Sequence, residues 1–203
     1  MPVRILLTGL AGGVLLFFWG FVAHEVVPLG TTDMKHLGDR EDAVIATMRD
    51  QIKVPGLYAF PFWDTSLPKD QQEASRKKAD EKNHSGPHGL LFVDPKGNTR
   101  TLPGYLVVEF ITNVITALLA AFLLSQASGL TSFGSRVMFV ALLGLIAGIA
   151  VNVPQWNWYY FPTGFTIAAL VEHVVGFALV GVAAALIMKP KAAAASAPAG
   201  APA

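Results

Sequence analysis

The chain has 203 residues, of which 53% are hydrophobic and only 14% are charged, and its formal net charge is +1. Soluble proteins carry about a quarter charged residues, so this composition excludes an ordinary soluble domain. The near-neutral charge, with no basic patch, gives no indication of nucleic-acid binding. Cysteine is absent, which excludes disulfides, thiolate metal sites and a cysteine nucleophile.

Four apolar segments are long enough to cross a membrane. A bilayer core about 30 Å thick requires about 20 apolar residues in a helix. Windows that approach or meet this length cover residues 5–23, 105–125, 137–153 and 164–188. We expect the first window to stay as an anchor rather than to be cleaved as a signal peptide, because it is long and Phe21 stands where cleavage after Ala23 needs a small residue. The predicted fold is an all-α membrane protein, a four-transmembrane-helix bundle with a small α+β extracytoplasmic insertion between helices one and two.

Positive charges predict how these helices are oriented. Arg4, Arg136 and Lys189, followed by Lys191, all fall on one side of the four windows, and positively charged loops stay in the cytoplasm. Both termini are therefore expected in the cytoplasm of a bacterium, with the helices in its inner membrane. The cytoplasmic segments are residues 1–4, the loop 126–136 and an Ala/Pro-rich tail at 189–203 that we expect to be disordered. Residues 24–104 and an aromatic loop at 154–163 are expected in the periplasm.

The 24–104 insertion alternates between helical and strand-like patterns. Residues 39–52 place apolar side chains at helical spacing behind Asp39, which predicts an amphipathic helix. Residues 57–62 resemble a short edge strand, and the polar stretch 70–82 predicts a solvated helix or a linker. A hairpin is expected further on, with strands at 90–93 and 99–102 joined by a turn at 94–98.

Polar residues gather in the outer halves of the predicted membrane helices. Ionisable groups inside a membrane are costly and mark a functional site by default. The residues are His24, Glu25, Glu109, Asn113, Asn152, Glu172 and His173. The inner halves contain no ionisable residue, which weighs against a proton pump or an ion-coupled transporter.

This polar cluster has four interpretations. The first is a structural hydrogen-bond network. A zinc or iron site would use His24, Glu109, Glu172 and His173 as ligands. A haem would be held between His24 and His173, and a quinone or lipid would occupy a pocket beneath the aromatic loop. The first interpretation needs no cofactor, and we predict none.

The aromatic loop has two interpretations of its own. Its aromatic residues include Trp156, Trp158, Tyr159 and Tyr160. Such side chains favour the membrane interface, which predicts an interfacial belt, although a ligand-stacking lid fits the same residues. Gly9 with Gly13 and Gly144 with Gly148 have the spacing that lets membrane helices approach closely.

Several runs of sequence also resemble a family of small four-helix bacterial inner-membrane proteins to which no activity is assigned. The runs are Trp19–His24, Glu41–Val44, Pro55–Pro61, Pro103–Phe110, Trp156–Tyr159 and Glu172–Gly176. The resemblance implies four helices and a bacterial inner membrane, and it brings no site residues.

No sequence motif nominates a nucleophile or a phosphate loop. We therefore expect a non-enzymatic accessory or structural membrane component whose partners are the lipid bilayer and other membrane proteins. A redox protein that binds a metal, haem or quinone is the first alternative. A transporter of a small or lipophilic molecule is the second.

Overall fold

The computed structural model describes residues 2–189, and the chain forms two compact units. Among the described residues, the helical unit consists of 2–34, 100–156 and 161–189. The small unit consists of Lys35–Thr99 together with Asn157–Tyr160. The tail predicted to be disordered lies, apart from Lys189, outside the described residues.

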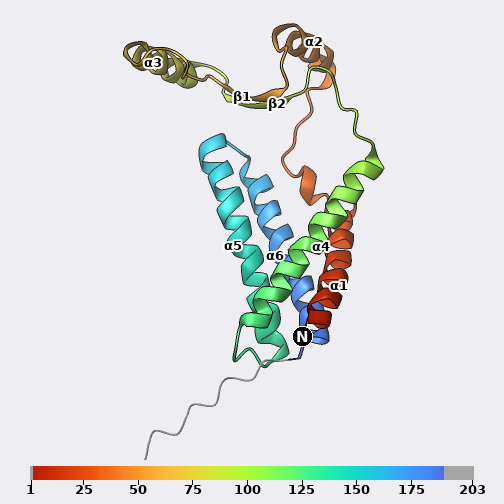
Figure 1. Ribbon diagram of the computed structural model, residues 1–203. Coiled ribbons are helices and arrows are strands. Elements are labelled where there is room, and N and C mark those ends of the chain that lie inside the picture. The colour runs from red at the N-terminus through yellow and green to blue at the C-terminus, as the bar shows by residue number, and fades with distance from the viewer. Residues whose placement is uncertain (1, 190–203) are drawn as a thin grey trace, which may run out of the picture. The chain divides into compact units, whose positions relative to one another are not determined.

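Long helices make up most of the helical unit (Figure 1). They are α1 (Pro2–Phe21), α4 (Leu102–Gln126), α5 (Phe133–Tyr159) and α6 (Thr163–Ile187). Within residues 2–189, these four helices are long and apolar enough to cross a membrane, with α1 extended to Val26 by a π-helical turn. The expected number of long apolar helices is confirmed.

Helix α5 is longer than its apolar run, and this corrects the predicted loop at 154–163. The helix starts after Ser132, whose hydroxyl accepts the Ser135 N–H at 3.1 Å as an N-cap. It continues through Pro154 to Tyr159, so the loop before α6 contains only residues 160–162. The predicted boundary followed the end of the apolar run. The backbone hydrogen bonding of the helix continues past this point, where the side chains become polar.

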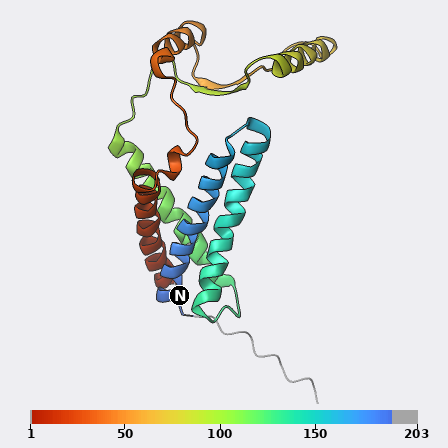
Figure 2. The same cartoon turned by 180° about the vertical axis from the view of Figure 1, so that it is seen from behind.

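Glycines set the close approach of the helices. A Cβ on Gly13 would lie 2.7 Å from the Cα of Val114 on α4, and one on Gly9 would overlap the side chain of Leu118. A Cβ on Gly144 of α5 would lie 2.6 Å from the carbonyl oxygen of His173 on α6. The prediction that the glycine pairs pack helices is confirmed, and α1 lies beside α4 while α5 lies beside α6 (Figure 2).

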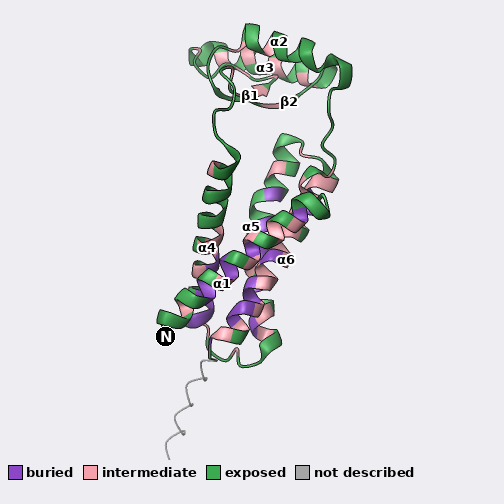
Figure 3. Ribbon diagram, turned by 90° about the vertical axis from the view of Figure 1, so that its right-hand side faces the viewer, coloured by how far each residue is buried: buried purple, intermediate pink, exposed green. Residues whose placement is uncertain are grey.

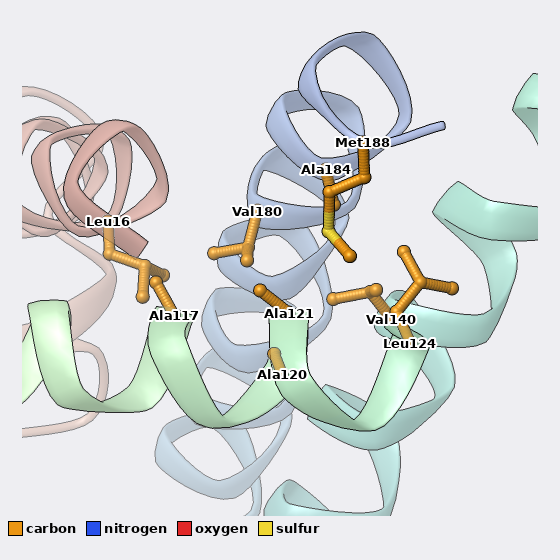
Figure 4. Packing of buried hydrophobic residues seen from close by; sticks show 9 residues of the cluster. All are labelled: Leu16, Ala117, Ala120, Ala121, Leu124, Val140, Val180, Ala184 and Met188. Carbon is orange, nitrogen blue, oxygen red and sulfur yellow. The ribbon is translucent and has the colours of Figure 1, made fainter. Parts of the chain in front are cut away.

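The buried cluster of the helical unit, in which four of nine side chains are alanine, lies toward one end of the helices. This end, where α1 begins and α6 ends, is called the Arg136 end below, and the opposite end is called the His24 end. The buried cluster comprises Leu16, Ala117, Ala120, Ala121, Leu124, Val140, Val180, Ala184 and Met188 (Figure 4). No described residue of α4 before Ala117 is buried (Figure 3), so the first half of α4 is packed much less tightly.

The small unit contains two helices and a two-stranded sheet. Its elements are α2 (Glu41–Gln51), β1 (Gly56–Phe60), α3 (Lys69–Ser85) and β2 (Gly89–Val93). The strands pair antiparallel, with Tyr58 opposite Leu91. The predicted amphipathic helix and first strand are confirmed, with α2 preceded by a 3₁₀ turn, η3 (Gly38–Arg40). Of the two interpretations of residues 70–82, a solvated helix or a linker, the structure has the helix.

The predicted hairpin between residues 90–93 and 99–102 is wrong. Strand β2 pairs with β1, and residues 99–101 form no strand in the described chain. Leu102 and Pro103 begin α4 instead, because proline has a fixed backbone angle and no N–H, which suits the first turn of a helix. The turn itself is present, since the Asp94 carboxylate accepts the Lys96 N–H at 3.0 Å.

Candidate functional site

The His24 end of α1 finishes in a π-helical turn, η1 (Val22–Val26), in which the Val27 N–H donates to the Val22 carbonyl at 2.9 Å. A π-turn inserts one residue into a helix and is frequent at functional sites. His24 lies in this turn, and its Nε2 is 3.2 Å from Oε1 of Glu172 on α6. The His24 and Glu172 side chains are 52% and 27% exposed, so this polar contact is partly open.

A short segment after the π-turn folds over the His24 ring. Residues Leu29–Thr31 form a 3₁₀ turn, η2. A Cβ on Gly30 would overlap the imidazole ring of His24. Glycine at this position therefore lets the backbone cover the ring directly.

Two further contacts join the same region to α6. The Trp19 indole N–H donates to the Glu172 carbonyl oxygen at 3.0 Å. A Cβ on Gly164, at the start of α6, would overlap Asp33 and would lie 3.3 Å from the Thr32 side chain. The last turns of α1 and the residues that follow it are thus attached to α6 through Trp19, His24 and the 32–33 segment, a set of contacts called the α1–α6 latch below.

Four other residues of the predicted cluster bond within their own helices. The His173 Nδ1 lies 2.7 Å from the Ala169 carbonyl oxygen, so this nitrogen is the donor. The buried Asn152 amide donates to the Gly148 carbonyl at 3.0 Å. Asn113 donates to the Glu109 carboxylate at 2.9 Å, one turn apart on the exposed half of α4.

The structure therefore brings together one pair of the predicted cluster from different helices, His24 and Glu172. Glu25 is exposed in the π-turn beside them. Within residues 2–189, no three His, Cys, Asp or Glu side chains are arranged to hold a metal ion. The four suggested ligands, His24, Glu109, Glu172 and His173, are consequently not gathered around one centre in the described structure.

The aromatic residues predicted for the outer loop lie in three different settings. The Trp156 indole donates to the Thr163 hydroxyl at 3.1 Å and closes the short α5–α6 connection. Trp158 and Tyr159 are exposed in the last turn of α5. The Tyr160 ring lies 4.0 Å from the His88 ring, centroid to centroid, within the small unit.

A pocket of about 230 Å³ lies in the small unit around this aromatic pair. Half of the residues that line it carry aromatic rings, with Phe60, Trp63, His88 and Tyr160 among them, and Asp80 contributes a carboxylate. Aromatic walls with a few polar groups are typical of small-molecule sites.

Sequence reasoning missed two residues that the structure makes important. Trp19 was taken only as part of an apolar helix, although an indole N–H in such a helix needs a partner. Arg136 was counted only as a loop charge, yet its side chain is 4% exposed and its guanidinium donates to carbonyl oxygens at the end of α6. The sequence feature that could have revealed this role is the position of Arg136 in the first turn of α5. A positive charge there is unfavourable to that helix's own dipole, so the guanidinium needs a partner elsewhere.

The four apolar helices fit the class of multi-pass membrane proteins. Comparisons with protein-family models, with curated proteins and with solved structures find no match to this chain. The functional argument therefore depends on the geometry described above.

Proposed function

We propose that this protein is a non-enzymatic accessory component of a bacterial inner membrane. Its α1–α6 latch fixes the point at which the small unit leaves the membrane. The observation that carries the proposal is the pattern of bonding in the polar cluster. The bonded residues of the cluster each contact a neighbouring helix or another group of their own helix, as in a structural network, and no three of its His and Glu side chains gather around a shared centre in residues 2–189.

The proposed orientation places both termini in the cytoplasm and residues 24–104 in the periplasm. Arg4, Arg136 and Lys189 are at the Arg136 end, which the positive-inside rule assigns to the cytoplasm. The His24 end then faces the periplasm, and the latch lies where the chain enters it.

An exposed polar surface on α4 supports a partner within the membrane. Glu109 is exposed and Asn113 is half-buried, and they bond each other on the half of α4 that contains no fully buried residue. A polar pair facing lipid is unfavourable, and such residues in membrane helices usually face other protein. We infer that another membrane protein covers this half of α4.

The latch can be tested by cysteine labelling, because the natural chain has no cysteine. Thr32→Cys places one thiol in the segment that packs on α6. Glu172→Ala removes the carboxylate that holds His24 and should raise the labelling rate of this thiol at least threefold. Glu109→Ala is the matched control, since it removes a carboxylate bonded only within α4, and it should leave the rate unchanged. Equal rates in all three proteins would contradict the proposed role of the latch.

A second candidate function is binding of a small aromatic or quinoid ring by the pocket in the small unit. The observation that favours it is the His88–Tyr160 ring contact within an aromatic wall. A soluble quinone analogue should quench tryptophan fluorescence in the natural protein and less so in His88→Ala. Quenching that is identical in both proteins would remove this candidate.

A further inference from the structure

The last turn of α6 attracts positively charged side chains from two other helices. Arg136 of α5 donates to the carbonyl oxygens of Met188 at 2.7 Å and of Ala184 and Ala185 at 3.2 Å. Arg4 of α1 donates to the Ile187 carbonyl oxygen at 3.2 Å. The C-terminal end of a helix carries a partial negative charge, which explains why both guanidinium groups gather there.

These cations have no acidic residue nearby in sequence to balance them. All 14 acidic residues lie between Glu25 and Glu109 or at Glu172. The helix end supplies about half a negative charge, whereas Arg4 and Arg136 supply two full positive charges. Lys189, directly after α6, adds a third. The Arg136 end therefore carries a clear excess of positive charge.

The three cations differ in what they can reach. Arg136 is 4% exposed and its donors face the α6 carbonyl groups, so it acts on its surroundings through its charge. Arg4 is exposed and donates one N–H to the Ile187 carbonyl oxygen. A guanidinium has five N–H donors, so others can bind a further group. Lys189 is also exposed. Arg4 and Lys189 can therefore contact an anion from outside.

Apolar side chains are exposed at the same end of these helices. Val3 and Leu7 on α1 are 65% and 51% exposed, and Leu186 on α6 is 73% exposed. The bond from Arg4 to Ile187 shows that the start of α1 meets the end of α6. Exposed apolar surface beside exposed cations matches a molecule with an anionic head and hydrocarbon chains.

We propose that the Arg136 end holds the headgroup of an anionic phospholipid. Arg4 and Lys189 contact the phosphate, the buried charge of Arg136 strengthens the attraction, and the acyl chains lie along the exposed apolar residues of α1 and α6. An arginine fork suits phosphate oxygens, and basic sites between membrane helices bind anionic lipid headgroups on the cytoplasmic side. This inference is independent of the role proposed for the latch.

The test uses the full chain in nanodiscs of phosphatidylcholine with increasing phosphatidylglycerol, and in detergent for native mass spectrometry. The natural protein should retain phosphatidylglycerol in preference to phosphatidylcholine. Arg4→Gln combined with Lys189→Gln should weaken that retention at least tenfold. Lys77→Gln combined with Lys78→Gln is the charge-matched control, because both lysines are exposed on α3, and it should bind like the natural protein.

Three results would overturn the proposal. They are equal retention of both lipids, equal loss of phosphatidylglycerol in the control variant, and millimolar inorganic phosphate displacing the lipid completely, which would mean a free-phosphate site. Lys189→Gln alone provides a second variant if the double variant folds poorly. Its retention of phosphatidylglycerol should fall at least threefold, and an unchanged value would also contradict the site.

Discussion

Replacing Arg136 by leucine removes the positive charge that three carbonyl oxygens of α6 share. Polar contacts between membrane helices contribute about 0.6 kcal/mol each, so the three bonds of Arg136 together contribute roughly 2 kcal/mol. A cation at a helix C-terminus adds about 1 kcal/mol. We therefore expect Arg136→Leu to lower the free energy of unfolding by about 3 kcal/mol.

The measurement is unfolding of detergent-purified protein, followed by circular dichroism and tryptophan fluorescence. Arg4→Leu is the control, because Arg4 is exposed and makes one bond to the same turn of α6. Exposed interactions of this kind contribute up to about 1 kcal/mol. Arg136→Lys keeps the charge but loses the planar fork, and its effect should lie between the two. Equal destabilisation by Arg136→Leu and Arg4→Leu would refute the reasoning.

Three further predictions concern packing, the latch and the small unit. Gly144→Ala should destabilise the protein by about 1–3 kcal/mol, because the new Cβ meets the His173 carbonyl oxygen, whereas Gly20→Ala, with nothing within 4 Å of its Cβ, should not. A double-mutant cycle of His24→Ala and Glu172→Ala should give a coupling of about 0.5 kcal/mol, and zero coupling would exclude a direct interaction. Hydrogen bonds from the Ser66 hydroxyl and backbone N–H hold the pKa of Asp64 below its ordinary value of 3.8, so these bonds favour the folded state above that pH and are lost as the pH falls through the lowered pKa. Ser66→Ala should raise the Asp64 pKa in a carboxyl NMR titration, and an unchanged pKa would show that the hydroxyl does not contribute.

The long helices could be predicted from sequence because each depends on one local property, an apolar run of sufficient length. Their ends could not, since they depend on backbone bonding. Ser132 starts α5 before its apolar run, and the helix passes Pro154 to reach Tyr159. The pairing of β2 was also missed, because a local turn at Asp94 favoured the next segment while the true partner, β1, lies about 30 residues earlier.

In the candidate site, too, the local features could be predicted from the sequence and the contacts between helices could not. The polar residues themselves were evident from the sequence, and Glu109 and Asn113, four residues apart on one helix, bond each other. That His24 meets Glu172 depends on the π-turn and on which faces of α1 and α6 pack together. Sequence spacing within one helix carries no information on either point.

The central claim, a four-span protein with both termini on one side and the small unit on the other, is tested most directly by cysteine accessibility in intact cells. The chain supplies no cysteine of its own. Ala74→Cys on α3 and Ser128→Cys between α4 and α5 each place one thiol at an exposed position. A membrane-impermeant maleimide should label Ala74→Cys in intact cells and Ser128→Cys only after lysis. Labelling of Ser128→Cys in intact cells, or protection of Ala74→Cys until lysis, would contradict the proposed topology.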